Sequence, residues 1–188
     1  MPTTNLNHFI RIYDHHLNRG LCERLITAFE QAVHLQQRNG RQHNRGLEES
    51  AWTEMNVSHS ADPQLLSFFR TQMDEALAKY NRDVGLPIAI PNSAKTSDLI
   101  LKRYQAGANE RFQIHFDSLN EVSNRYLVLL WYLNDVDAGG ETVFPDTERI
   151  IRPAAGRLLI FPPYWMYQHA GRAPTSGPKY ILSTYLLF

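Results

Sequence analysis

Two histidines and one aspartate in the second half of the chain could together hold a divalent metal ion. His115 and Asp117 are separated by one residue, Phe116, in a segment expected to be extended. Side chains at positions i and i+2 of a strand project from the same face, so those of His115 and Asp117 should do so. His169 returns after a run of predicted strands, in the approach to the last one. Two imidazoles and one carboxylate form the facial triad, which leaves open positions on iron(II). Because these ligand types also suit manganese and zinc, the sequence predicts a metal site without choosing the ion.

A lysine near the C-terminus could belong to the same site. Lys179 follows His169 at the point where the chain enters an apolar strand. An ammonium group directed into a barrel interior is costly unless an anion meets it there, and a dicarboxylate co-substrate would provide that anion. The alternative, which position alone leaves open, is a lysine that points outward at the start of the strand.

The composition predicts one globular domain with no charge excess. The chain has 188 residues, of which 43% are hydrophobic, and this is enough for one domain with a sizeable core. Lys plus Arg and Asp plus Glu balance at 19 each, whereas nucleic-acid and membrane-surface partners favour a basic excess. We therefore expect neither a nucleic-acid partner nor membrane association.

The cysteine content and the N-terminal sequence predict a cytoplasmic protein. The single cysteine, Cys22, can form neither an internal disulfide nor a thiolate metal cluster, which suits a reducing compartment. The N-terminus has no basic segment followed by an apolar run. No apolar stretch approaches the roughly 20 residues needed to span a bilayer.

The first part of the chain predicts two helices and two short strands. Asn18 is a suitable N-cap for the first helix, and Asp62 followed by Pro63 starts the second, which ends near Gly85. The predicted strands cover 9–13 and 52–57, and the predicted helices cover 18–34 and 62–85. The apolar stripe of the first helix should lie against a sheet and consists of Leu21, Leu25, Ile26, Phe29 and Val33.

From residue 98 onward the hydrophobic period changes from helical to strand-like. Short strands separated by turn residues, after two helices, predict an α+β, mainly β fold: an antiparallel barrel or jelly roll supported by helices on one side. We expect a single domain over 1–188, with strands and supporting helices in 1–97 and the jelly-roll core in 98–188. Strands are predicted at 99–104, 112–116, 126–133, 158–161 and 180–188.

Two polar or proline-containing segments are predicted to be loops. The range 35–50 favours a solvated loop, and the alternative is a basic lip of Arg38, Arg41 and Arg45 that grips a substrate. The range 85–97 is either a connector or a lid. Gly and Pro at the ends of both segments would permit hinge motion.

Ordered landmarks cover the last 85 residues of the chain. They are Tyr104-x-x-Gly107, His115-x-Asp117, Arg125, Tyr132-Leu133-Asn134, Gly139-Gly140-Glu141-Thr142-x-Phe144, Pro153-x-x-Gly156, Leu159-x-Phe161, His169 and Gly177-x-Lys179. With these landmarks the segment resembles the double-stranded β-helix of the iron(II)- and 2-oxoglutarate-dependent oxygenases, and within them the prolyl-4-hydroxylase-like branch. The first 100 residues match only by the pattern of a strand and two helices before the barrel.

The resemblance implies a role for each matching residue. His115, Asp117 and His169 would bind iron(II). The co-substrate 2-oxoglutarate would chelate the same ion, and oxygen would bind to it at the remaining position. The resemblance also allows ascorbate as a further cofactor. The residues implied for 2-oxoglutarate binding are Lys179, Thr142, Tyr132 and Tyr104. The candidate substrate contacts are Arg125, by resemblance, and Trp165 and Tyr167, by their position beside the second histidine.

The implied reaction is hydroxylation of an unactivated C–H bond, with succinate and carbon dioxide as co-products. We expect the substrate to be a prolyl or similar residue in a peptide or protein. The short loop between Asp117 and Arg125 makes a free amino acid or small metabolite a serious alternative. A non-catalytic jelly-roll binding module is the alternative from another class. A nucleic-acid demethylase ranks third, because the arginines that this branch places after the distal histidine are reduced here to Arg172.

Overall fold

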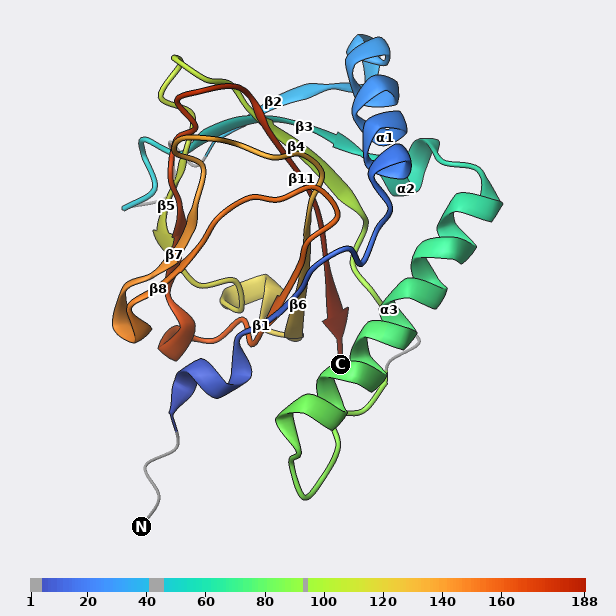
Figure 1. Cartoon of the computed structure of the whole chain (residues 1–188), viewed down its shortest axis with the longest axis vertical. Helices are drawn as coiled ribbons and strands as arrows, with labels where there is room; N and C mark the ends of the chain where they lie inside the picture. Colours follow the sequence, from blue (N-terminus) through green and yellow to red (C-terminus); the bar gives the residue numbers. More distant parts are fainter. Residues whose placement is uncertain (1–4, 41–45, 93–94) are drawn as a thin grey trace.

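The computed structural model describes residues 5–40, 46–92 and 95–188, and within them eleven strands form two antiparallel sheets (Figure 1). The large sheet has the order β1-β9-β6-β11-β4-β3-β2, and the small sheet has the order β5-β10-β7-β8. The strands of the large sheet are β1 (Arg11–Tyr13), β2 (Gln37–Gly40), β3 (Ala51–Asn56), β4 (Ile100–Tyr104), β6 (Arg125–Tyr132), β9 (Leu158–Phe161) and β11 (Lys179–Leu187). Those of the small sheet are β5 (Phe112–His115), β7 (Thr142–Phe144), β8 (Arg149–Ile151) and β10 (His169–Gly171).

From β4 onward the chain passes repeatedly from one sheet to the other. β4, β6, β9 and β11 belong to the large sheet, while β5, β7, β8 and β10 belong to the small sheet. This alternation winds the chain into a double-stranded β-helix, and the jelly roll that the sequence predicts is confirmed. The central strands β6 and β11 pair from Ile181↔Tyr132 to Leu187↔Arg125. Both are buried along most of their length, which explains their nearly continuous apolar sequence.

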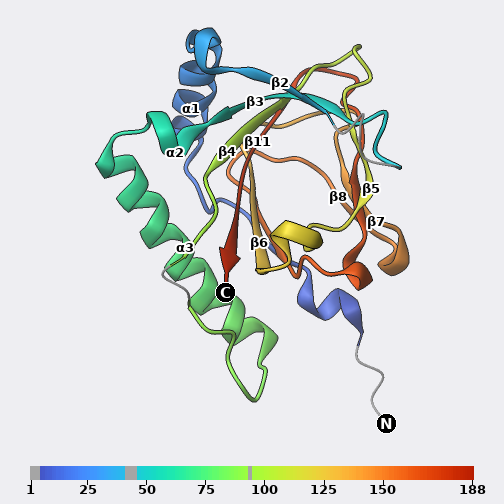
Figure 2. The same cartoon turned by 180° about the vertical axis from the view of Figure 1, so that it is seen from behind.

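Helices α1 (Arg19–Gln31), α2 (Val57–Ser60) and α3 (Pro63–Val84) lie on the side of the large sheet that faces away from the small sheet (Figures 1 and 2). The predicted caps are present: the Asn18 side chain accepts from the Leu21 N–H at 2.8 Å, and the Asp62 side chain accepts from the Leu65 N–H at 2.7 Å. Gly85 ends α3 in the left-handed conformation. None of the helices within the described ranges combines the length and the apolar character needed to cross a membrane.

Five short 3-10 helices complete the described part of the chain. They are Leu6–Phe9, Val33–Leu35, Asn120–Val122, Pro145–Thr147 and Trp165–Tyr167.

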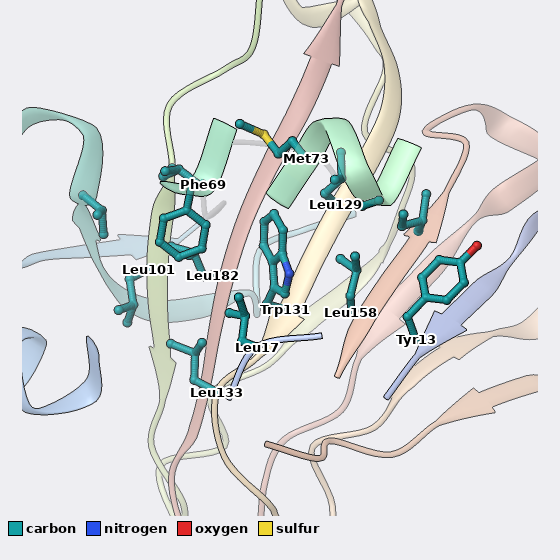
Figure 3. Packing of buried hydrophobic residues seen from close by; sticks show 14 of the residues in the cluster. Tyr13, Leu17, Phe69, Met73, Leu101, Leu129, Trp131, Leu133, Leu158 and Leu182 are labelled. Carbon is teal, nitrogen blue, oxygen red and sulfur yellow. The ribbon is translucent and has the colours of Figure 1, made fainter. Parts of the chain in front are cut away.

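Buried side chains form one cluster between the helices and the large sheet and a second cluster between the two sheets. In the first, Phe69 and Met73 of α3 reach Trp131 on β6 (Figure 3), with the Phe69 and Trp131 rings edge to face at a centroid distance of 5.6 Å. The second cluster includes Tyr104, Tyr132 and further aromatic rings inside the barrel. Apolar side chains therefore fill much of the space between the two sheets.

Several predicted boundaries are corrected by the structure. The first helix ends at Gln31 rather than at residue 34, and Val33 is 68% exposed instead of lying on the apolar stripe. The predicted strand over 9–13 begins only at Arg11, because residues up to Phe9 form a 3-10 turn. Ala32, the C-cap residue, leaves the helical conformation, and a 3-10 turn over Val33–Leu35 follows before β2.

The predicted loop over 35–50 contains a strand that the sequence did not indicate. β2 pairs with β3 from Gln37↔Glu54 to Gly40↔Ala51. It has no apolar side chain, and Gln37 and Arg38 are exposed, so backbone pairing with the sheet edge rather than hydrophobic burial makes it a strand. The three-residue strands β7, β8 and β10 were missed for a related reason, since three residues are too few to show a period.

Gly156 joins the segment before α1 to the barrel. Its φ is +80°, its N–H donates to the Tyr132 carbonyl at 2.9 Å, and its carbonyl accepts from the Leu17 N–H at 3.1 Å. A Cβ atom at this position would lie 2.1 Å from the Leu17 carbonyl oxygen. Only glycine satisfies both the backbone conformation and the close approach.

We expect Gly156→Ala to lower the free energy of unfolding by more than about 2 kcal/mol, because both φ strain and a backbone clash are introduced. Chemical denaturation monitored by circular dichroism measures this change. Gly177→Ala is the matched control, since nothing lies within 4 Å of a Cβ at that position. Equal stability of the two variants would contradict this role for Gly156.

Candidate metal centre

The pairing of β5 with β10 places the two predicted histidine ligands side by side. His115 and His169 are direct cross-strand partners, at the end of β5 and the start of β10. His169 thus begins a strand of its own rather than lying in an approach to the last strand. Asp117 follows β5 and brings Oδ1 to 3.5 Å from Nε2 of His115 and Oδ2 to 3.5 Å from Nε2 of His169. One potential ligand atom from each of the three residues lies within 4.8 Å of the others.

Backbone carbonyls fix the orientation of both imidazoles. Nδ1 of His115 donates to the Gln113 carbonyl at 2.7 Å, and Nδ1 of His169 donates to the Tyr167 carbonyl at 3.1 Å. Since a carbonyl only accepts, the proton is on Nδ1 and the Nε2 lone pair faces the cluster. Nε2 of His115 is buried without a hydrogen-bond partner among the described residues. A buried, unpaired acceptor is expensive, and a bound metal ion would satisfy it.

The electrostatics of the cluster favour the protonation states that bind a metal. Burial raises the pKa of Asp117, but the two histidines lower it by more, so the pKa lies well below its ordinary range. Burial, with His115 as the next cause, lowers the pKa of His169 to about 4. At neutral pH Asp117 is ionised and His169 is neutral, which are the states that metal coordination requires.

Aromatic rings hold the two imidazoles in place. The Phe112 ring stacks on His115 at a centroid distance of 3.5 Å, and the Phe161 and Phe144 rings lie 4.7 Å and 5.5 Å from His169. The ligands are therefore preorganised by packing as well as by hydrogen bonds.

Lys179 occupies the barrel interior. It is 2% exposed, and its Nζ lies 5.0 Å from the Tyr104 ring centroid and 5.9 Å from that of Tyr132. No carboxylate of the described residues is within ion-pair distance of it, and burial lowers its pKa to about 7. The inward prediction for Lys179 is thus correct and the outward alternative is wrong. Beside it the Tyr132 hydroxyl donates to Oγ1 of Thr142 at 2.6 Å.

Two adjoining hollows border the metal cluster. The inner one, of about 40 Å³, extends from the cluster to Lys179 and includes Tyr104 and Thr142 in its lining. The outer one, of about 280 Å³, opens from Asp117 toward solvent. The residues that line both are Lys102, Phe112, Asp117, Ser183 and Tyr185.

The outer hollow is lined by charges of both signs. Glu54 and Asp98 contribute carboxylates, and Lys102 and Arg125 contribute cations. Arg125 Nη1 donates to the Asp117 backbone carbonyl at 3.2 Å, and its guanidinium covers the Tyr185 ring at 3.8 Å. A register shift between β6 and β11 at this point turns Arg125 inward.

Three residues that line both hollows, Lys102, Ser183 and Tyr185, were not predicted from the sequence. A period-two signal was present, because positions 179, 181, 183 and 185 of β11 share the inward face with Lys179. Lys102 precedes Tyr104 by two residues on β4 and faces inward for the same reason. Without the strand register, this signal could not separate the inward from the outward face.

Several candidate substrate contacts lie elsewhere. Tyr167 is 3% exposed, packs in the cluster between the sheets and lines neither hollow. Trp165 is 64% exposed and also lines neither hollow. In the predicted basic lip, Arg38 pairs with the buried Glu110. Arg41 and Arg45 lie outside the described residues.

Comparison with known sequences finds two matches of note. The model of the family described as "2OG-Fe(II) oxygenase superfamily" matches residues 99–187. The chain is 31% identical over 127 residues to "Probable prolyl 4-hydroxylase 11" of Arabidopsis thaliana, an alignment that covers 62% of this chain and 43% of that protein. The chain spans less than half the length of the curated relatives it matches.

Two solved structures with a similar fold are described as prolyl hydroxylases. The viral collagen prolyl hydroxylase from Paramecium Bursaria Chlorella virus-1, in its 2OG complex, superposes with a TM-score of 0.70 at 19% identity and covers 97% of this chain and 98% of its own. The prolyl hydroxylase from Trichoplax adhaerens, in complex with a hypoxia-inducible-factor peptide fragment, gives a TM-score of 0.74 at 17% identity and coverages of 97% and 86%. The cofactors predicted from the sequence, iron(II) and 2-oxoglutarate, are those in the name of the matched superfamily.

The lowered pKa of His169 predicts a pH dependence of stability. Between pH 6.5 and pH 4 the His169 side chain is protonated in the unfolded chain but neutral in the folded metal-free protein. The free energy of unfolding should therefore decrease, by up to about 3 kcal/mol, as the pH is lowered from 6.5 to 4. Urea denaturation at several pH values measures this fall. His169→Gln should reduce the slope, whereas the exposed His34→Gln should leave it unchanged. A slope unaffected by His169→Gln would disprove the assignment.

Proposed function

We propose that this protein is an iron(II)- and 2-oxoglutarate-dependent dioxygenase that hydroxylates a prolyl or similar residue in a peptide or protein, because the model of the 2OG-Fe(II) oxygenase superfamily matches residues 99–187. One observation carries this proposal: His115, Asp117 and His169 converge at one end of a barrel cavity that holds the unpaired Lys179. A binding module would have no need for an open ligand set and a buried cation facing the same hollow.

The three converging side chains would hold the iron. Their donor set, two neutral imidazoles and an ionised carboxylate, fits iron(II) and occupies one face of the ion. Bound iron(II), with oxygen and 2-oxoglutarate, supplies the insertion of one oxygen atom into a C–H bond of the substrate, while the other oxygen atom enters succinate and carbon dioxide leaves. The protein contributes ligand geometry, through the two Nδ1–H hydrogen bonds and the Phe112 stack.

Lys179 would pair with the distal carboxylate of 2-oxoglutarate. Burial makes this ammonium costly in the free protein, so a carboxylate that reaches it recovers a charge pair in a dry environment. Thr142, held by Tyr132, offers a hydroxyl beside it, and Tyr104 adds its ring.

The walls of the inner hollow would keep water from the reacting atoms. Val128, Leu130, Phe161 and Ile181 give it an apolar lining between the metal cluster and Lys179. A dry site strengthens every charge interaction inside it and protects reactive species from side reactions.

The substrate would enter through the outer hollow. Asp117 lines this hollow, so a residue placed there would lie beside a carboxylate that would hold the metal. The Arg125 guanidinium donates a hydrogen bond to the Asp117 backbone carbonyl, and its further N–H groups could donate to a peptide carbonyl. The related prolyl hydroxylases, one of them bound to a peptide fragment, support a peptide as the substrate class.

Anaerobic titration with iron(II) and 2-oxoglutarate tests the cofactor site. We expect a weak visible charge-transfer band in the wild type, none in His169→Ala, and a 2-oxoglutarate affinity at least about 30-fold weaker in Lys179→Met. With a free-protein pKa of about 7, Lys179 must take up a proton to pair with the carboxylate, so affinity should fall as pH rises above 7. This pH dependence should disappear in Lys179→Met and persist in Lys79→Met, a surface control. No band in folded, metal-replete wild type would favour the binding module.

A succinate-formation assay tests the substrate class. Proline-containing peptides should stimulate succinate formation by the wild type and gain the mass of one oxygen atom, and His169→Ala should do neither. Free amino acids in the same assay serve as competitors. Turnover stimulated by free amino acids alone would show that the peptide assignment is wrong.

A further inference from the structure

One oxygen of the Asp117 carboxylate has a hydrogen-bond donor from outside the ligand set. The Tyr185 hydroxyl donates to Oδ1 at 3.1 Å, whereas no described residue donates a hydrogen bond to Oδ2. We propose that Tyr185 is a positioning residue that keeps Asp117 a one-oxygen ligand, with Oδ1 held by the phenol and Oδ2 left for the metal. This inference rests on the proposed function, because it concerns the same metal centre.

The backbone of Tyr185 is fixed along both edges of its strand. On one side it pairs with Val128 of β6. On the other, its N–H donates to Oγ of Ser97 at 3.0 Å and its carbonyl accepts from the Ser97 N–H at 3.0 Å. The phenol is therefore aimed by a backbone that has little freedom to move.

Arg125 holds the donor and the acceptor together. Its guanidinium lies 3.8 Å from the centre of the Tyr185 ring, and its Nη1 donates to the Asp117 backbone carbonyl at 3.2 Å. The same side chain thus fixes the ring that carries the hydroxyl and the residue whose carboxylate receives the hydrogen bond. A cation stacked on the ring also makes the phenol a better donor, because it draws electron density from the oxygen.

The proposed role follows from how many positions a carboxylate takes on a metal. A carboxylate with both oxygens free can bind an ion through either one or both of them. Two-oxygen binding by Asp117 would occupy a position that 2-oxoglutarate or oxygen needs. A hydrogen bond to Oδ1 lowers its charge and opposes this second bond.

Cobalt(II)-loaded protein provides a test that does not depend on turnover. Tyr185→Phe keeps the ring under Arg125 but loses the hydroxyl that bonds Oδ1 of Asp117. We expect this variant to bind cobalt(II) with an affinity within about threefold of the wild type, because the freed Oδ1 can then bind the ion as well. Its cobalt absorption spectrum should change, and its 2-oxoglutarate affinity by calorimetry should fall on the order of 10-fold, the factor for one hydrogen bond to a charged group. Tyr80→Phe is the matched control, since it loses a buried hydroxyl that bonds the Phe9 carbonyl far from the metal cluster.

The outcomes separate this inference from the proposed function. A wild type that binds cobalt(II) and 2-oxoglutarate, with a Tyr185→Phe variant of unchanged spectrum and affinity, would overturn the positioning role alone. A wild type that binds neither would overturn the proposed function and this inference with it. An equal fall in 2-oxoglutarate affinity in Tyr80→Phe would identify a general effect of destabilisation and would also overturn the positioning role.

Discussion

The antiparallel pairing of β5 with β10 is the constraint on which the site depends. It sets His115 opposite His169, although more than fifty residues separate them in the chain. Each imidazole then donates a hydrogen bond from Nδ1 to the carbonyl of the residue two positions earlier in the chain. The same hydrogen bond in both segments turns both Nε2 atoms toward Asp117. A shift of one residue in the pairing would send one imidazole to the opposite face of the small sheet.

Two of the buried charged groups in this barrel have partners, whereas a third, Lys179, has no carboxylate partner among the described residues. The Glu110 carboxylate accepts from the Gln105 N–H and pairs with Arg38, which makes it a structural group. Asp117 is stabilised by the histidines and by Tyr185. Lys179 has no carboxylate partner among the described residues and carries a lowered pKa, which is the pattern of a group prepared for a ligand rather than for folding.

The supporting helices stiffen the sheet that carries half of the site. Packing of α1 and α3 buries the outer face of β6 and β11, so the inner faces of the same strands are held in register. Both helices start at residues whose side chains cap the first turn, a local signal that the sequence carries in full. The end of the second helix at Gly85 is also correctly predicted, whereas the first helix ends at Gln31, three residues before its predicted end.

Sequence alone determined the long strands, both helix starts and the placing of His115 and Asp117 on one face, because each rests on a local period, a cap or a short spacing. It also indicated the jelly-roll class and His169 as the third candidate ligand, but the meeting of His169 with His115 depends on the long-range pairing of β5 with β10. The short strands β7, β8 and β10 have no such signal and exist because neighbouring strands satisfy their backbone groups. Only the tertiary structure decided that Lys179 points inward and that Tyr185 reaches Asp117. The physical reason is strand register: it chooses the face on which a side chain lies, and long-range pairing sets it.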